Sequence, residues 1–461
     1  MANNPYGLDW LPDLSHRKAD VYVALADAIG DDIKRGRLKA GAKLPPQRLL
    51  AYTLGLNLGT VHKAYRLATK RGLVSGEVGR GSFVRGDAAS NADWPNEDPC
   101  SRMIDFCDNF PCPIRKVALV QKQLEVLSKT SNLGQLLQYQ QNSAWANHKH
   151  IAATWLGRFG VSATPSTTLI ANGALHAGFI SLLTLCRAGD TVLTEDMTSQ
   201  AIKGAARRLK LRLKGIKTDD KGIIPEHLDE LLRKERVSAV YLVPTLHNPT
   251  STLLPLGRRR KVAAILAHHG VPLIEDDIFA PLLDEVPTPI SALIPDLGFY
   301  IAGLSKALAP SLRLAFLKVP ERHYTDALDC LRLTSWYASP LLMELAGNLI
   351  TSGDADRLIG EQRREINKRQ EAARNAFRGH GLYAAHPCAL HGWLKLPDPW
   401  RATQFTETLR EAGVLVQSAE AFAVERSQAV HAVRLCLGTP GSFTKVTEGL
   451  QMISDVLRRR L

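Results

Sequence analysis

The sequence has 461 residues, of which 45% are hydrophobic and 22% are charged, and its formal net charge is +13. A chain of this length exceeds what one hydrophobic core usually organises, so two or more domains are expected. The composition excludes a disordered chain, and no apolar run approaches the roughly 18 residues of a membrane-spanning helix, which excludes a membrane-embedded protein.

The amino terminus and the cysteines indicate a cytoplasmic protein. The first residues lack a basic start followed by an apolar core, so no secretory signal is visible. The seven cysteines are scattered without paired short spacings, at positions 100, 107, 112, 186, 330, 388 and 436. They favour reduced thiols over a disulfide framework or a zinc site, and no metal site is predicted.

The amino-terminal residues predict three helices followed by a hairpin. Apolar residues recur at helical spacing over residues 17–35, and further helices are predicted over 47–54 and from about 59 to 71. Residues 55–57 make a glycine-containing turn between the last two helices, which is the helix-turn-helix pattern. Residues 72–84 alternate around glycines as a small hairpin does.

Positive charge is concentrated in this segment. Residues 1–86 hold 14 Lys and Arg against 7 Asp and Glu, so +7 of the excess lies in under a fifth of the chain. The third helix carries polar and basic side chains, namely Thr60, His62, Lys63, Arg66, Lys70 and Arg71. These features predict a polyanion-binding domain, and on charge alone a helical packing domain with a solvated basic face is an equal alternative. Residues 87–101 are small, polar and proline-containing, which indicates a linker.

A strand, a glycine turn and a helix are predicted over residues 168–180. Free backbone N–H groups at Gly173, Ala174 and Leu175 would begin that helix, and such a terminus can cradle a phosphate. Turns of this kind are common, so the prediction depends on the motifs that follow.

Three short apolar strands, at about 239–243, 271–274 and 299–302, each run out into chemistry-bearing residues. Asn248 follows the first, Asp276 the second and Lys306 the third. A helical stretch of crossover length separates the first two, so parallel pairing is expected, and the carboxyl ends of parallel strands are where ligands bind.

This set of residue types, completed by Arg313, suits pyridoxal phosphate. A lysine amine condenses with its aldehyde, a carboxylate pairs with its pyridinium nitrogen, and cationic or backbone donors hold its phosphate. Taken alone, a Ser-Lys after a strand is most often part of a solvated loop. Three strand ends with matching chemistry reverse that reading.

The quoted motifs resemble known families. Asn248-Pro-Thr, Glu275-Asp-Asp and Ser305-Lys-Ala-Leu-Ala-Pro-Ser-Leu-Arg resemble the core of fold-type I aminotransferases. Leu44-Pro-Pro-Gln-Arg, the helix-turn-helix and Gly79-Arg-Gly-Ser-Phe-Val resemble the GntR winged helix. The chain as a whole is similar to the MocR family, which joins the two.

The resemblance implies an α/β protein with an amino-terminal winged helix-turn-helix. We expect the DNA-binding domain over 1–86, the linker over 87–101 and an aminotransferase-like large domain, with a mostly parallel sheet flanked by helices, over 102–319. A small α+β domain is expected over 320–461.

For DNA, the resemblance implies operator contacts from the helix-turn-helix and from the wing tip, where Val78 and Gly79 lie. The expected DNA-binding residues are Arg48, Asn57, Thr60, His62, Lys63 and Gly79. Many GntR domains have arginine at the positions of Leu58 and His62. The base preference is therefore expected to differ in this chain.

For the cofactor, pyridoxal 5'-phosphate, the resemblance implies a Schiff base on Lys306. The expected cofactor-binding residues are Gly173, Ala174, Leu175, Asn248, Asp276, Ser305, Arg313 and, from the partner subunit, Tyr139. A buried core tyrosine is an equal interpretation of Tyr139. Arg434 would bind the carboxylate of an amino-compound effector, and its alternative is an arginine that faces solvent or a structural carboxylate.

Several positions depart from the aminotransferases. Phe279 replaces a tyrosine whose hydroxyl meets the cofactor, Ser199 replaces a stacking aromatic ring, and Gly303 and Ser251 replace a serine and a glycine. Each lost hydrogen bond is worth about 0.5 to 3 kcal/mol, which argues against efficient turnover.

The sequence thus predicts a transcriptional regulator that binds double-stranded operator DNA and senses an amino compound through Lys306. A head-to-tail, domain-swapped homodimer is expected from the resemblance. One alternative is an active aminotransferase that carries a DNA-binding domain. Another is a regulator that has lost the cofactor, or that senses pyridoxal phosphate itself.

Overall fold

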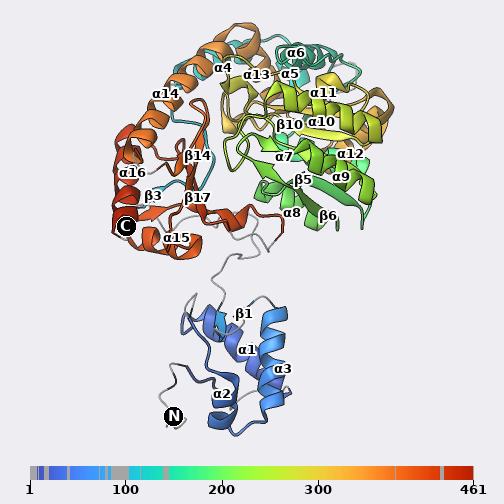
Figure 1. Cartoon of the computed structure of the whole chain (residues 1–461). Coiled ribbons are helices and arrows are strands. Elements are labelled where there is room, and N and C mark those ends of the chain that lie inside the picture. The colour runs from blue at the N-terminus through green and yellow to red at the C-terminus, as the bar shows by residue number, and fades with distance from the viewer. Residues whose placement is uncertain are drawn as a thin grey trace. The chain divides into compact units, whose positions relative to one another are not determined.

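The computed structural model describes residues 8, 10–14, 20–38, 42–71, 73–77, 81–84, 103–114, 116–138, 145–378, 381–425 and 430–459. The chain divides into two compact units, Met1–Asn96 and Glu97–Leu461 (Figure 1). The finer boundaries at residues 86, 101 and 319 stay predictions.

The described part of the first unit confirms the predicted order of helices and hairpin. Its elements are α1 (Val21–Lys34), α2 (Gln47–Leu54), α3 (Leu58–Lys70), β1 (Val74–Glu77) and β2 (Gly81–Val84). α2 ends at Gly55, whose φ of 64° is left-handed and therefore suits a residue without a Cβ. α3 buries the residues that recur at helical spacing, namely Val61, Ala64, Tyr65 and Ala68.

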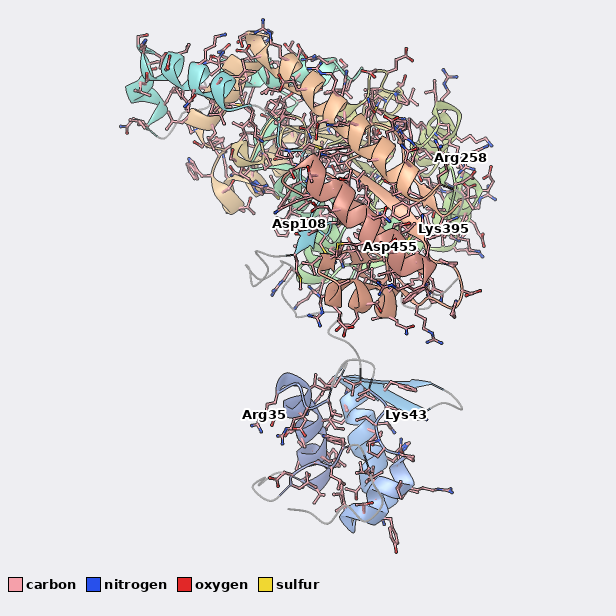
Figure 2. The ribbon with its side chains drawn as sticks, turned by 90° about the vertical axis from the view of Figure 1, so that its left-hand side faces the viewer. Arg35, Lys43, Asp108, Arg258, Lys395 and Asp455 are labelled. Carbon is pink, nitrogen blue, oxygen red and sulfur yellow. The ribbon has the colours of Figure 1, made fainter. Side chains whose placement is uncertain are left out.

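The hairpin is tied to the start of α2. β1 and β2 pair antiparallel, with Val74 opposite Val84. Lys43, which is labelled in Figure 2, forms a β-bridge with Phe83. Its Nζ lies 5.9 Å from the centre of the Phe83 ring. The N–H of Leu44 donates to the carbonyl of Ser82 at 2.8 Å. The start of α2 and the hairpin therefore form one continuous surface.

The second unit is built on a seven-stranded sheet in the order β4-β12-β11-β10-β9-β5-β6. The strands are β4 (Thr168–Ala171), β5 (Thr191–Glu195), β6 (Arg212–Ile216), β9 (Ala239–Leu242), β10 (Leu273–Asp276), β11 (Gly298–Gly303) and β12 (Ala315–Lys318). β12 runs antiparallel to both β11 and β4, whereas the neighbouring pairs from β11 to β6 are parallel. The carboxyl ends of these strands consequently meet at one edge, as predicted.

Helices cover both faces of this sheet. The bounds are α4 (Val117–Ser128), α5 (Leu133–Leu136), α6 (Ala146–Gly157), α7 (Ala174–Leu185), α8 (Gln200–Arg208), α9 (Pro225–Lys234), α10 (Leu256–His269), α11 (Ile290–Leu293), α12 (Tyr324–Ser335) and α13 (Pro340–Thr351). Phe299 and Ile301 belong to one core cluster, and the intervening Tyr300 and Ala302 to another. Burial on both faces explains why these strands read as continuous apolar runs.

A four-stranded sheet in the order β13-β14-β17-β16 forms a second layer in the carboxyl-terminal part of this unit. Its strands are β13 (Tyr383–Ala384), β14 (His391–Lys395), β16 (Gln417–Ser418) and β17 (Ala432–Cys436), and it packs with α14 (Asp354–Ala376), α15 (Ala402–Glu411) and α16 (Phe443–Arg458). β3 (Ile104–Asp105) pairs in parallel with β15 (Val414–Leu415), so the segment that enters the second unit joins this layer. Two strands of two residues each, β7 (Thr218–Asp219) and β8 (Gly222–Ile223), pair antiparallel as a short hairpin that follows β6 in the chain.

Within the described ranges, no helix has both the length and the apolar character that crossing a bilayer requires.

Candidate functional site

The sheet edge brings together four side chains that the sequence singled out. Lys306 follows β11, Asn248 follows β9, and Arg434 comes from β17 of the second layer. Asp276 is the last residue of β10, whereas it was predicted to lie just past the strand; the strand starts at Leu273 and continues through Glu275, which pairs with β11. Arg434 Nη1 donates to Asn248 Oδ1 at 2.7 Å and thereby links the two layers.

Asp276 has one oxygen satisfied and one not. The hydroxyl of Tyr241, on β9, donates to Asp276 Oδ2 at 2.5 Å. Asp276 Oδ1 is buried and has no hydrogen-bond partner in the part of the chain that the structure describes. Burial raises the pKa of Asp276 to about 6, although the bond from Tyr241 opposes the rise. The site therefore presents a carboxylate oxygen that can accept a hydrogen bond from a ligand.

Lys306 is half-buried, and its amine donates to the backbone carbonyl of Asn109. Desolvation lowers the pKa of Lys306 to about 8, and the Arg434 guanidinium acts in the same direction. A lysine with a lowered pKa has a larger neutral fraction near pH 7, and the neutral amine is the nucleophile. Lys306 therefore has the reactivity that a carbonyl ligand requires.

Gly173 and Arg313 meet at the start of α7. Gly173 has φ of 88°, and a Cβ at this position would lie 3.1 Å from the guanidinium of Arg313. Arg313 itself adopts a left-handed backbone, φ 49°, which is strained for a residue with a side chain. The backbone N–H groups of Ala174 and Leu175 lie in the first turn of α7, where the helix itself offers no carbonyl to accept from them. A helix start beside a guanidinium at such a corner can bind an anion.

The polar side chains at this corner are available. Among the described residues, neither the exposed Arg313 side chain nor the half-buried hydroxyl of Ser305 makes a hydrogen bond. A Cβ at Gly303 would lie 2.9 Å from Ile278 and 3.7 Å from Ala174. Ile278 thus fills the space that a serine at position 303 would need, which explains one departure from the aminotransferases.

Arg434 is held on several sides. Besides its bond to Asn248, its Nη2 donates to the carbonyl of Cys107, and its guanidinium lies 4.6 Å from the ring centre of Phe422. Arg434 Nε is buried and lacks a hydrogen-bond partner within the described residues. The guanidinium is therefore pre-oriented and still has a donor to offer.

Two departures have local explanations in the structure. Phe279 is fully buried, and its ring centre lies 5.6 Å from that of His391, so a side chain without a hydroxyl occupies this place. Ser199 caps α8, because its hydroxyl accepts from the N–H of Ile202 at 3.4 Å. Phe279 therefore supplies no hydroxyl, and Ser199 supplies no aromatic ring.

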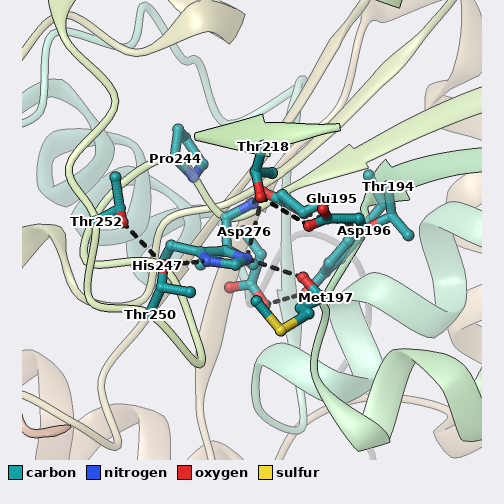
Figure 3. A network of polar contacts seen from close by, with 12 residues as sticks. Thr194, Glu195, Asp196, Met197, Thr218, Pro244, His247, Thr250, Thr252 and Asp276 are labelled. Carbon is teal, nitrogen blue, oxygen red and sulfur yellow. Dashed lines mark hydrogen bonds and ion pairs between the residues drawn. The ribbon is translucent and has the colours of Figure 1, made fainter. Parts of the chain in front are cut away.

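A buried polar network, which sequence reasoning missed, surrounds His247, the residue before Asn248. His247 Nε2 donates to the carbonyl of Met197 at 3.1 Å, and its Nδ1 lies 2.8 Å from the Thr250 hydroxyl (Figure 3). Glu195 accepts from the N–H of Val243 at 2.7 Å, and burial raises the pKa of Glu195 to about 7. Burial lowers the pKa of His247 to about 4, so its ring is neutral. The network fixes the loop that carries Asn248.

His391 connects this loop to the acceptor of Lys306. Its Nε2 donates to the carbonyl of His247 at 2.9 Å, and its Nδ1 lies 3.0 Å from Asn109 Nδ2. Burial lowers the pKa of His391 to about 3, so Nδ1 is an acceptor for that amide. Tyr241 has a signal in the sequence, because it is a hydroxyl-bearing residue within a predicted apolar strand, whereas backbone acceptors such as Asn109 have none.

The predicted DNA-binding residues of the first unit lie mostly on its surface. Arg48, His62 and Lys63 are exposed and Thr60 is half-buried. Asn57 caps α3, since its side-chain oxygen accepts from the N–H of Gly59 at 2.8 Å. A groove joins the starts of α2 and α3 to the hairpin, and its lining includes Lys43, Gln47, Arg48, Asn57, Leu58, His62 and Ser82.

Three predicted contact residues lie outside the described residues: Val78, Gly79 and Tyr139.

Comparisons with known proteins agree with both halves of this description. Residues 101–450 match the family described as aminotransferase class I and II, and residues 21–84 match the bacterial regulatory proteins of the gntR family. The chain is 30% identical over 453 residues to the HTH-type transcriptional regulator YdeF of Bacillus subtilis, covering 98% of this chain and 97% of that protein. It is also 30% identical over 419 residues to PtsJ of Salmonella typhimurium, a vitamin B6 salvage pathway transcriptional repressor, covering 90% and 93% of the two chains.

Solved aminotransferases share the fold of the second unit. The α-aminoadipate aminotransferase LysN of Thermus thermophilus superposes with a TM-score of 0.70 at 21% identity, over 78% of this chain and 93% of its own. The kynurenine aminotransferase of Pyrococcus horikoshii gives a TM-score of 0.72 at 21% identity, over 81% and 97%. The chain therefore belongs to the MocR family of transcriptional regulators, in which a GntR-type DNA-binding domain is joined to an aminotransferase-like domain whose cofactor is pyridoxal phosphate.

Proposed function

We propose that this protein regulates transcription by binding operator DNA through its winged helix and by sensing an amino compound at Lys306. The observation that carries the proposal is the buried, unpartnered Oδ1 of Asp276 in the same site as a desolvated lysine. An unsatisfied buried carboxylate oxygen calls for an explanation, and a hydrogen-bond donor on a ligand supplies one. Binding of operator DNA, in the manner of the bacterial gntR-family regulators that residues 21–84 match, would place the protein in the cytoplasm.

The side chains present fit pyridoxal phosphate. Asp276 would accept a hydrogen bond from the pyridine nitrogen. Asn248 would donate from its amide nitrogen to the phenolate oxygen on the ring, while its own oxygen still accepts from Arg434. Gly173, Ala174, Leu175, Ser305 and Arg313 would hold the phosphate, where the free guanidinium and the start of α7 already face a common corner. When bound, the cofactor supplies an aldehyde that condenses with primary amines.

Lys306 and Arg434 would do the remaining work. Lys306 would hold the cofactor by condensing its neutral amine with the aldehyde, with loss of water, and the Asn109 carbonyl orients that amine by accepting a hydrogen bond from it. Arg434 would bind the carboxylate of the effector through the donors that now reach Cys107 and through its free Nε. Because effector binding must change these contacts, its free energy can couple to DNA binding, and the coupling is reciprocal.

A homodimer is also part of the proposal. Five large apolar side chains in one segment of the second unit are exposed, namely Phe110, Val117, Leu124, Val126 and Leu137. Exposed apolar side chains gathered in one segment favour an interaction surface. We propose that this segment contributes to a head-to-tail, domain-swapped dimer, with Tyr139 of each chain reaching the other's cofactor. Light scattering on the purified protein tests it, because a monomer at micromolar concentration would contradict it.

An enzymatic alternative is favoured by one observation, the presence of the whole set Lys306, Asp276, Asn248 and Arg434 at one edge. Phe279 and Ser199 argue against turnover, because Phe279 lacks the hydroxyl and Ser199 lacks the aromatic ring that the enzymes use at these positions. Incubation with amino acids and keto acids separates the two. Release of a new keto acid over many turnovers would support the enzyme, and a single conversion per site would support the regulator.

The cofactor site is tested by visible absorption of the wild type and of Lys306→Ala with added pyridoxal phosphate. We expect a visible band and, after borohydride reduction, a covalent mass increase on Lys306 in the wild type only. Lys318→Ala is a matched control, since that lysine is also desolvated, with a pKa of about 8, but reaches the carbonyls of Pro295 and Gly298 instead. The absence of band and mass increase from the wild type would overturn the proposed site.

A further inference from the structure

His62 and Gln47 form a hydrogen-bonded pair on the surface of the winged helix. His62 Nδ1 lies 3.1 Å from Gln47 Oε1, and both side chains line the groove between α2, α3 and the hairpin. Gln47 is the first residue of α2, and His62 is the fifth residue of α3. The pair therefore joins the starts of the two helices of the helix-turn-helix.

This contact decides which nitrogen of the neutral imidazole carries the proton. The side-chain oxygen of a glutamine only accepts hydrogen bonds, so Nδ1 of His62 must be the donor. In the neutral ring, Nε2 then has no proton and is an acceptor. The exposed edge of His62 can accept a hydrogen bond from DNA but has none to donate from Nε2.

Leu58 lies next to His62 on the same face. The two residues are four positions apart in α3, which makes them neighbours on a helix surface. Leu58 is 42% exposed and also lines the groove. Its side chain offers no hydrogen bond, so it suits an apolar partner. Asn57, at the same end of the helix, has its oxygen committed to the cap.

Few base pairs present, in the major groove, both a hydrogen-bond donor for His62 Nε2 and an apolar group for Leu58. Hydrogen-bond donors there are the N6 amino group of adenine and the N4 amino group of cytosine, and the apolar feature is the methyl group of thymine. Guanine offers only acceptors, which Nε2 cannot use. An A·T pair presents an amino group and a methyl group together, whereas a G·C pair presents no methyl.

We propose that the Gln47–His62 pair, with Leu58, makes α3 select an A·T pair where the start of the helix meets the major groove. This rests on DNA binding through the winged helix. Gln47 positions the ring, and His62 and Leu58 read the pair. Replacing the preferred A·T pair by G·C is expected to weaken binding about tenfold, within the usual cost of one mismatched pair.

Selection from a random double-stranded DNA library, with the full-length protein at mildly alkaline pH, tests the proposal. His62→Arg should replace the preference for A·T by one for G at one position of each half-site, because arginine donates to guanine O6 and N7. Gln47→Ala, which frees the tautomer, should weaken the preference at that same position and leave the rest of the motif unchanged. His431→Asn, at an exposed histidine of the second unit, is the control and should reproduce the wild-type motif.

Two results would overturn the assignment. One is a wild-type motif with G·C at the position that His62→Arg alters. The other is an unchanged motif in both His62→Arg and Gln47→Ala, with thermal melting showing that both variants are folded. Failure of the wild type to enrich any sequence is a different result, since it would reject DNA binding by the winged helix altogether.

Discussion

The two ends of the cofactor site are prepared in different ways. At the phosphate end, the Arg313 side chain is exposed, makes no hydrogen bond among the described residues and sits on a strained backbone. At the ring end, Asp276 accepts a hydrogen bond from Tyr241. Arg434, from the second layer, donates to Asn248 and to the carbonyl of Cys107. The ring end is therefore organised by the protein itself, whereas the phosphate end depends on its ligand.

This difference has a practical consequence. Pyridoxal lacks the phosphate, so it engages the ring end alone, whereas pyridoxal phosphate engages both. Measuring each variant with both ligands assigns its defect to one end. The distinction between the two ends would be wrong if replacing a residue at the phosphate end weakened the binding of pyridoxal as much as that of pyridoxal phosphate.

The largest effect is expected at Asp276. Asp276→Asn keeps the shape and still accepts from Tyr241, but it removes the charge that pairs with the ring nitrogen. Loss of one member of a buried charge pair costs about 3 kcal/mol or more, which is over a hundredfold in affinity. We expect that loss for pyridoxal and pyridoxal phosphate alike, measured by spectroscopic titration. An equal affinity of variant and wild type for pyridoxal would show that Asp276 does not meet the ring.

The same carboxyl predicts a pH effect on the protein without cofactor. The pKa of Asp276 is about 6 in the folded protein and near 3.9 when unfolded. The folded state therefore binds the extra proton between about pH 4 and pH 6, and its stability falls as pH rises through that window. Asp276→Asn lacks this penalty, so its stability relative to the wild type should increase by about 2 kcal/mol from pH 4 to pH 7, discounting for partial exposure.

Urea unfolding of both proteins at several pH values measures this difference. Bound cofactor would mask it, so the protein is first freed of cofactor by dialysis against an amine. A difference that stays constant with pH would mean that Asp276 titrates normally, and that its environment is more polar than the structure indicates.

A smaller effect is expected at the phosphate end. Arg313→Ala removes one charge-assisted hydrogen bond from an exposed position, so affinity for pyridoxal phosphate should fall about tenfold, or roughly 1.4 kcal/mol. Affinity for pyridoxal should not change. Arg313→Lys retains the charge and should lose less. A defect of Arg313→Ala with both ligands would contradict the separation of the two ends.

Much of the site was predictable because the residues that carry it follow strands. Apolar runs of four or five residues mark buried parallel strands, and such strands must end at one edge, so Lys306, Asn248 and Asp276 were brought together by pattern alone. The same holds for α2, whose predicted bounds are those observed, because Pro46 precedes it and Gly55 ends it.

The remainder depends on contacts between distant parts of the chain. Lys306 and Asn109 are 197 positions apart, and their contact uses a backbone carbonyl that every residue type has. The bond from Arg434 to Cys107 has the same character. No sequence pattern distinguishes such acceptors. Asn57 illustrates a local ambiguity, because asparagine before a helix can cap it as readily as it can meet DNA, and its oxygen caps α3.

The smallest expected effect tests how the ring end is organised. Tyr241→Phe removes the hydroxyl that donates to Asp276 Oδ2 and leaves that oxygen without its partner. Because the bond lowers the pKa of Asp276, its loss should raise that pKa further. Part of the carboxylate would then be protonated near neutral pH, and affinity for both ligands should fall a few-fold, or about 1 kcal/mol.

The pH profile makes Tyr241→Phe decisive. A few-fold loss that disappears at alkaline pH, where Asp276 is charged in both proteins, shows that Tyr241 acts through the carboxylate. Tyr300→Phe is a matched control: its hydroxyl donates to Asp277 at 2.9 Å, so affinity should not change. A loss of affinity in Tyr241→Phe that persists at alkaline pH would mean that the tyrosine contacts the ligand directly. The ring end, like the phosphate end, would then depend on its ligand for its organisation.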